Sequence, residues 1–379
     1  MLLLIPGPVT TRPETRAALA RDIAPWDNDF RDVLIRLRGR ILHLAGGIEG
    51  THAALMLQGC GHFVTEAALR SFLPPAASGT GTRILIPATG AYADRMIRLA
   101  REAGRAVVTL PVGRIERADP AAIARALAED ATISHVGIVY SETGSGVIHD
   151  VPAIGAAVRQ AGRRMIVDAV SAFGAMPLDL AVQPEIDAVV FTANKCLEAL
   201  PGIAFAVARI DRLEGRAGQA GSWSLDLPAV YEHGVKSGWG SFRFTPPVQV
   251  LAALDTALDF HAAEGRAARL ARYTANMRTL YDGVRAMGLQ PWLPEALQGP
   301  VIVNVHVPAD PNWDLQVFVD GLKRRGFVIS NFFNTPTPTF RIGCIGAITP
   351  EDMGRAVEAM EAVLRDMGVT ERHPRLANA

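Results

Sequence analysis

Between about residues 54 and 208, short apolar runs alternate with segments of helical periodicity. Continuous apolar runs of this length are typical of strands that are buried on both faces. They predict strands at 54–57, 83–87, 106–110, 135–140, 164–168, 188–191 and 203–208. The periodic segments between them predict helices at 63–73, 91–103, 119–128 and 151–161. Strands that alternate with helices predict an α/β fold with a mostly parallel sheet covered on both faces.

The pattern changes after Phe244–Pro247. Residues 248–287 are predicted to be helical, with a break near Glu264 and Gly265, and a smaller α+β domain follows. Its predicted elements are a strand at 301–307, a helix at 315–325, strands at 327–330 and 339–342, and a helix after Thr349. We therefore expect four parts, which are an N-terminal segment (1–20), a large domain (21–247), a small domain (248–368) and a tail (369–379).

Composition limits the class of protein without fixing its chemistry. The 379 residues are 49% hydrophobic and 20% charged, which suits a soluble globular protein. The net charge is zero, so nothing suggests nucleic acid or an acidic membrane surface as a partner. The three cysteines lie far apart in the sequence, which favours reduced thiols in the cytoplasm. No run approaches the roughly 20 apolar residues of a membrane span. The nine histidines lack metal-ligand spacing, so no metal site is expected.

Lys195 stands out because the chain otherwise fills its basic positions with arginine. Of the 38 Lys and Arg residues only Lys195, Lys236 and Lys323 are lysines. An amine can lose its proton near neutral pH and a guanidinium cannot. Lys195 follows a predicted buried strand and precedes a Pro-Gly loop, a position typical of lysines that form Schiff bases. The alternative interpretation is a surface lysine at a strand end.

Two further segments carry candidate chemistry. The glycine-rich turn Gln58–His62 joins a strand to a helix, so its free N–H groups and the helix dipole could bind an anion, with Cys60 and His62 as added donors. Asp168 ends a strand, where a carboxylate would face a ligand at the mouth of the sheet. An ordinary tight turn and a helix or turn cap are the alternatives. The turn does not have the GxGxxG pattern, so NAD is not expected.

The three features together satisfy the needs of pyridoxal phosphate. The turn at 58–62 would anchor the phosphate, Asp168 would pair with the ring nitrogen, and Lys195 would supply the amine. Tyr92, after another predicted strand, could stack on the ring; a core residue or the start of a helix is the alternative.

Ordered segments over residues 3–367 resemble the class V aminotransferases, which have the aspartate-aminotransferase-like fold (fold type I) and use pyridoxal phosphate. The likeness is strongest to those that transfer the amino group of 2-aminoethylphosphonate to pyruvate, giving phosphonoacetaldehyde and alanine. These segments are residues 1–11, 58–67, 90–92, 141–143, 167–169, 193–196 with 201–202, 243–245 and 340–343.

The resemblance implies a role for each matching residue. Lys195 would form the Schiff base and move the proton. The cofactor would be held by Gly61, His62, Tyr92, Thr143, Asp168, Asn194 and Thr245. Thr245 would act from the neighbouring subunit, which implies a homodimer with shared active sites. Arg341 would bind the carboxylate of the oxo acid, Gly7 would place the N-terminal segment at the substrate pocket, and Arg243 could bind the phosphonate or form a structural ion pair.

Three segments differ from the phosphonate transaminases. They are Gly59–His62, Ser141–Gly146 and Ser330–Asn334, where two aromatics replace a segment that often carries a lysine. His62 and the aromatics favour the alternative of an alanine–glyoxylate or serine–pyruvate type of aminotransferase. A cysteine desulfurase, which would need a mobile nucleophilic cysteine, and a cofactor-binding protein without turnover are further alternatives. Cys344 lies beside Arg341 at the end of a predicted strand, which disfavours the desulfurase.

Overall fold

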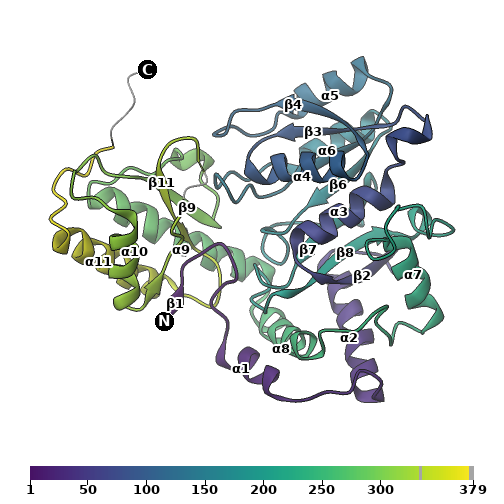
Figure 1. Cartoon of the computed structure of the whole chain (residues 1–379), viewed down its shortest axis with the longest axis horizontal. Coiled ribbons are helices and arrows are strands. Elements are labelled where there is room, and N and C mark those ends of the chain that lie inside the picture. Colours follow the sequence, from purple (N-terminus) through teal and green to yellow (C-terminus); the bar gives the residue numbers. More distant parts are fainter. Residues whose placement is uncertain (333–334, 375–379) are drawn as a thin grey trace.

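The structure, a computed structural model, describes residues 1–332 and 335–374. A larger body is built on one sheet, and a smaller body is formed mainly by the C-terminal part of the chain (Figure 1). Phe333 and Asn334, from the aromatic segment singled out in the sequence, lie outside the described residues, as do residues 375–379 of the expected tail.

Within the described residues, seven strands form the sheet of the larger body. Their order is β2 (His52–Gly59), β8 (Gly202–Arg209), β7 (Ile186–Thr192), β6 (Arg164–Asp168), β5 (Ile133–Val139), β3 (Arg83–Ala88) and β4 (Ala106–Pro111). Strand β8 runs antiparallel to both of its neighbours, and the other pairs are parallel. The predicted strands of this region and the mostly parallel sheet are confirmed.

Alternate strand residues pack on the two faces of this sheet, as the two-residue period of a strand requires. One face is covered by α2 (Asn28–Leu44), α5 (Pro120–Glu129), α6 (Val151–Gln160) and α8 (Val248–Glu264). The other is covered by α3 (Gly61–Phe72), α4 (Ala91–Glu102) and α7 (Leu227–Lys236). Helices α2 and α7 were not predicted from the sequence.

The C-terminal part has its own core. Strand β9 (Ile302–His306) pairs antiparallel with β11 (Thr339–Gly343). The helices α9 (Arg266–Ala286), α10 (Leu315–Arg324) and α11 (Pro350–Asp366) pack around this pair. The predicted break between α8 and α9 is confirmed at Gly265, whose φ of +81° favours glycine.

The first residues of the chain belong with this C-terminal part. Strand β1 (Leu2–Leu3) pairs parallel with β10 (Phe327–Val328), which is shorter than the predicted strand at 327–330. Farther along, the Gly343 N–H donates to Leu4 O (2.8 Å) and the Ala347 N–H to Thr10 O (2.8 Å). The remaining short elements are α1 (Pro13–Ala17) and 3-10 turns at Ala18–Ala20, Ala76–Ser78, Ile210–Arg212 and Glu295–Leu297.

Candidate active site

Loops from distant parts of the sequence meet at one edge of the seven-stranded sheet. The parallel strands and β2 all end there, so residues just past their carboxyl ends come together. These loops surround a cavity of about 150 Å³. Its lining consists of Cys60, Gly61, His62, Thr65, Tyr92, Arg95, Met96, Leu99, Asp168, Val170, Thr192, Asn194 and Lys195. Six of the residues predicted from sequence, from Gly61 to Lys195, are therefore brought together.

Lys195 lies in the loop after β7 with only 9% of its surface exposed. Its Nζ donates a hydrogen bond to Pro6 O (2.8 Å). Burial and then the charge of Arg341 lower the pKa of the Lys195 amine to about 8. A substantial fraction of the amine is therefore neutral near physiological pH, as a nucleophile or a base requires. The alternative of a surface lysine is wrong.

Gly7 lies directly against Lys195. Its φ of +147° favours glycine, and a Cβ at this position would come within 2.6 Å of Lys195 Cδ and 2.7 Å of Nζ. Any larger residue would therefore push the amine out of its place. The structure thus brings the N-terminal segment to the site, as expected from the sequence.

Asp168 is the last residue of β6 and is 8% exposed. Burial raises its pKa to about 6, although hydrogen bonds from the Val170 N–H (3.0 Å) and the Thr65 hydroxyl (3.2 Å) act in the opposite direction. A cationic N–H group in the cavity would stabilise this carboxylate. A protonated ring nitrogen is a group of that kind.

The N-terminus of α3 supplies the features expected of an anion site. Cys60 occupies the N-cap position, and its Sγ lies 3.2 Å from His62 Nδ1. The first N–H groups of a helix have no partner within the helix. A Cβ on Gly61 would lie 2.8 Å from Val170 Cγ2, so glycine also allows close packing here. Among the described residues, the buried Thr192 hydroxyl has no hydrogen-bond partner, which leaves it available to a ligand.

Tyr92 lies in the first turn of α4 and contributes an aromatic surface to the cavity. The Arg95 guanidinium lies 4.8 Å from the centre of its ring. The buried Glu142 carboxylate accepts hydrogen bonds from the N–H groups of Tyr92 and Ala93 (3.2 Å), and so caps α4 and fixes the position of the tyrosine. Burial raises the pKa of Glu142 to about 6, against these hydrogen bonds.

Sequence reasoning missed Thr65, Arg95 and Glu142 as parts of the site. Thr65 and Arg95 could have been found from helical spacing, because each lies three residues after a predicted site residue on the same helix. Glu142 gives no comparable signal, because its contact with Tyr92 joins segments 50 residues apart.

Arg341 lies on β11 with 3% of its surface exposed. Its Nη1 donates to Thr143 O (2.8 Å), and its guanidinium lies 5.3 Å from the centre of the Phe332 ring. The Thr143 hydroxyl in turn lies 2.9 Å from Ser171 Oγ. The charge of Arg341 lowers the pKa of Lys195, so the two side chains lie in the same region of the protein. Thr143 and Arg341 therefore border the site, although neither lines the small cavity itself.

Arg243 and Thr245 do not reach this cavity within one chain. Arg243 donates from Nη1 to Trp223 O (2.7 Å) and lies 4.9 Å from the centre of the Phe244 ring. Thr245 is exposed. No ion pair of Arg243 is found among the described residues, so the structural alternative raised from the sequence gains no support.

Two of the three cysteines, Cys196 and Cys344, are buried and do not resemble nucleophiles. Burial raises the pKa of Cys196 to about 12 and also raises that of Cys344. The Cys196 thiol instead donates to Ser171 O at 3.6 Å. A desulfurase needs an accessible thiolate, and neither residue provides one.

Comparisons with known proteins agree with this geometry. The family model of class V aminotransferases matches residues 44–321. A 2-aminoethylphosphonate–pyruvate transaminase of Burkholderia lata is 42% identical over 97% of this chain and 96% of its own length. A 2-aminoethylphosphonate–pyruvate transaminase of a Polaromonas species is 38% identical over 100% of this chain and 98% of its own length.

Solved structures give the same fold. Pyridoxamine–pyruvate aminotransferase of Mesorhizobium loti has a TM-score of 0.86 and 26% identity over 98% of this chain and 93% of that one. An alanine–glyoxylate aminotransferase of a Nostoc species has a TM-score of 0.83 and 23% identity over 96% of this chain and 95% of that one. At this identity the likeness shows only that the two proteins share a fold. The chain belongs to the class V aminotransferases and has the expected fold type I.

Proposed function

We propose that this aminotransferase moves the amino group of 2-aminoethylphosphonate to pyruvate, with pyridoxal phosphate held in the cavity beside Lys195. Relatives about 40% identical over nearly the whole chain carry this activity in their names. The observation that carries the chemistry is the buried Lys195 amine with its lowered pKa, placed in one cavity with Asp168 and the N-terminus of α3.

The residues around the cavity fit this cofactor. Gly61, His62 and the unpartnered Thr192 hydroxyl would hold the phosphate, and Asn194 would add a polar contact. Asp168 would pair with the ring nitrogen, and Tyr92 and Val170 would pack against the ring. When bound, the cofactor acts as an electron sink that weakens the C–H bond beside the amino group.

The protein supplies the proton transfers and the placement of substrate. Lys195 Nζ, neutral in part because its pKa is about 8, takes the proton from the carbon that bears the amino group and returns it later. Arg341 binds the carboxylate of pyruvate through its planar guanidinium. Burial of Lys195 and Arg341 limits the competition of water for both groups.

We further propose that the enzyme is a cytoplasmic homodimer, in which Thr245 and Arg243 reach the cavity of the other subunit. Trp223 and Phe244, beside Arg243, are 76% and 38% exposed, which would suit a surface covered by a second copy. None of the helices within residues 1–332 and 335–374 is long and apolar enough to cross a membrane. We propose domain boundaries at residues 20, 247 and 368. The separate C-terminal core supports a small domain, although α8 packs on the large sheet.

The alternative of an alanine–glyoxylate or serine–pyruvate type of aminotransferase draws support from Phe332, whose ring lies against Arg341. An apolar ring at this point suits a small amino acid better than a phosphonate dianion.

Titration of the purified protein with single amino donors tests the proposal. We expect 2-aminoethylphosphonate to bleach the absorbance of the bound cofactor, and pyruvate to restore it with release of alanine. The Lys195→Ala protein should bind the cofactor but lose at least about 1000-fold of the rate, because the base is gone. A response to alanine or serine but not to 2-aminoethylphosphonate would support the alternative. Wild-type turnover by pure Lys195→Ala protein would rule out both.

A further inference from the structure

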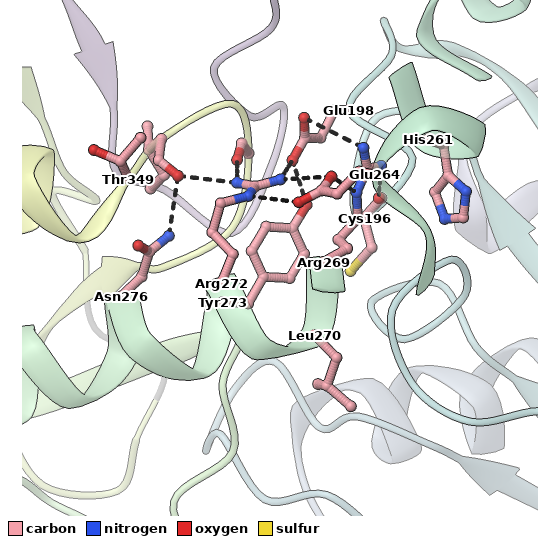
Figure 2. Close-up of polar contacts among 12 residues, drawn as sticks. Cys196, Glu198, His261, Glu264, Arg269, Leu270, Arg272, Tyr273, Asn276 and Thr349 are labelled. Atoms are coloured by element: carbon pink, nitrogen blue, oxygen red, sulfur yellow. Dashed lines mark hydrogen bonds and ion pairs between the residues drawn. The ribbon is translucent and has the colours of Figure 1, made fainter. Parts of the chain in front are cut away.

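A largely buried cluster of charged side chains lies between the Lys195 loop and the segment that follows β11 (Figure 2). We call it the Arg272 cluster, and it consists of Glu198, Glu264, Arg269, Arg272 and Tyr273. Two carboxylates and two guanidinium groups balance in charge. The cluster lies where α8 gives way to α9, outside the residues that line the cavity.

On one side the cluster holds the loop of the catalytic lysine. The Glu198 N–H donates to Lys195 O (2.9 Å), which closes the turn. Glu198 has a φ of +55°, in the left-handed region that residues other than glycine rarely occupy. Its Oε1 accepts hydrogen bonds from Arg272 Nη2 (2.7 Å) and the Tyr273 hydroxyl (2.6 Å). A strained residue persists where its surroundings fix it, and these two contacts do so here.

On the other side Arg272 holds the continuation of β11. Its Nη1 donates to Gly346 O (2.7 Å) and Ile348 O (2.9 Å). These carbonyls lie five and seven residues after Arg341. The same segment binds the N-terminal residues, because the Ala347 N–H donates to Thr10 O. One guanidinium therefore contacts both chain segments that place the reacting groups.

Glu264 fixes the orientation of that guanidinium. Its two oxygens accept from Arg272 Nε (2.7 Å) and Arg269 Nε (2.7 Å). Arg269 is fully buried and also donates to Cys196 O (2.8 Å), one residue after the lysine. Burial alone would raise the pKa of Glu264, but these hydrogen bonds lower it to about 2, so its charge persists.

We propose that Arg272 is a positioning residue, which sets the separation between the Lys195 amine and the Arg341 guanidinium by binding the Lys195 loop and the 344–348 segment at once. This inference rests on the proposed function for the roles of Lys195 and Arg341. Loss of Arg272 would let the two segments move independently. Lys195 and Arg341 would then be perturbed together, although Arg272 does not line the cavity.

Kinetics and spectroscopy of the cofactor-loaded Arg272→Met enzyme test the proposal. We expect the KM for pyruvate to rise about 10-fold or more, with kcat falling as well, because small misplacements of reacting groups are costly. The pH at which the cofactor absorbance changes should move upward, because Arg341 would no longer lower the proton affinity of Lys195 as strongly. Arg272→Lys keeps the charge but cannot span both segments. Its KM for pyruvate and the pH of its absorbance change should therefore lie between those of the wild type and of Arg272→Met.

Three further variants separate positioning from stability. Arg278→Met, at an exposed position on the same helix, should leave every measurement unchanged. Asn276→Ala removes hydrogen bonds to Cys344 O and Ile348 O but none to the Lys195 loop. It should therefore lower the midpoint of urea unfolding, but change the pH at which the cofactor absorbance changes less than Arg272→Met does. Glu198→Gln, which removes the charge that Arg272 binds on the lysine side, should raise the KM for pyruvate as Arg272→Met does.

The outcomes distinguish this inference from the proposed function. An Arg272→Lys or Glu198→Gln enzyme with lowered stability but wild-type KM and absorbance pH would overturn the inference, even if Arg272→Met failed to fold. A wild-type enzyme that ignores 2-aminoethylphosphonate, with an absorbance pH that still moves in the variants, would overturn the proposed substrate and leave the inference standing.

Discussion

At the scale of single residues, composition was the most informative signal. Lys195 stood out as one of only three lysines in an arginine-rich chain. The structure places it, buried, in the cavity with Asp168 and Gly61. The roles of Thr245 and Arg243 came only from the family resemblance. Neither residue reaches the cavity of its own chain. No local pattern in a sequence could reveal the contact with another subunit that we propose for them.

The pKa of Lys195 leads to a prediction at this scale. In cofactor-free protein treated with limiting acetic anhydride, acetylation of Lys195 should rise with pH and reach half its maximum near pH 8, because burial and Arg341 favour the neutral amine. Mass spectrometry can measure the acetylated fraction of Lys195 at each pH, with the exposed Lys236 and Lys323 as references.

Arg341→Met supplies the matched control for this measurement. It removes the second cause of the lowered pKa, so its midpoint should lie above that of the wild type. A wild-type midpoint above pH 10 would show that the amine is not buried as the structure describes.

At the scale of elements, strands were easier to predict than their pairing. Continuous apolar runs identified each strand of the larger sheet, because both faces of the sheet are buried. The reversed direction of β8 is set by the whole sheet and leaves no trace in its own residues. Helix α7 was missed although Asp226 caps it and Pro228 lies in its first turn, which are readable signals.

Helix α11 allows a prediction at this scale. Thr349 and Asp352 form a capping box at its N-terminus. Replacing Thr349 by alanine should cost about 1 kcal/mol of unfolding free energy, because the Asp352 N–H loses its acceptor. Urea unfolding measures this change.

The matched variant Thr349→Ser keeps the hydroxyl and should stay close to the wild type. Equal losses in the alanine and serine variants would mean that the capping hydrogen bond does not stabilise the helix.

At the scale of the whole molecule, the proposed sharing of active sites between subunits predicts complementation. Lys195→Ala and Arg243→Met enzymes should each lose most of their activity. In a mixed dimer, the subunit with Lys195 intact would receive Arg243 from its partner, so one complete site would form. Activity should therefore return when the two proteins are dissociated and reassociated together.

The same mixture has a defined negative result. If Arg243 served the cavity of its own chain, no mixed dimer would contain a complete site and activity would stay low. Each variant reassociated alone provides the baseline, and sedimentation velocity checks that dimers have formed.

The pairing of the first residues with the C-terminal part has a consequence for synthesis of the protein. Residues 2–10 leave the ribosome well before the residues that they bind, which are Gly326, Val328 and the 343–347 segment. The roughly 320 positions between them take about 15–65 s to translate at about 5–20 residues per second. Leu4, 1% exposed in the finished protein, has no C-terminal neighbours until then. The active site is therefore closed by two segments that are made far apart in time, and the later one follows long after the sheet that carries Lys195 has emerged.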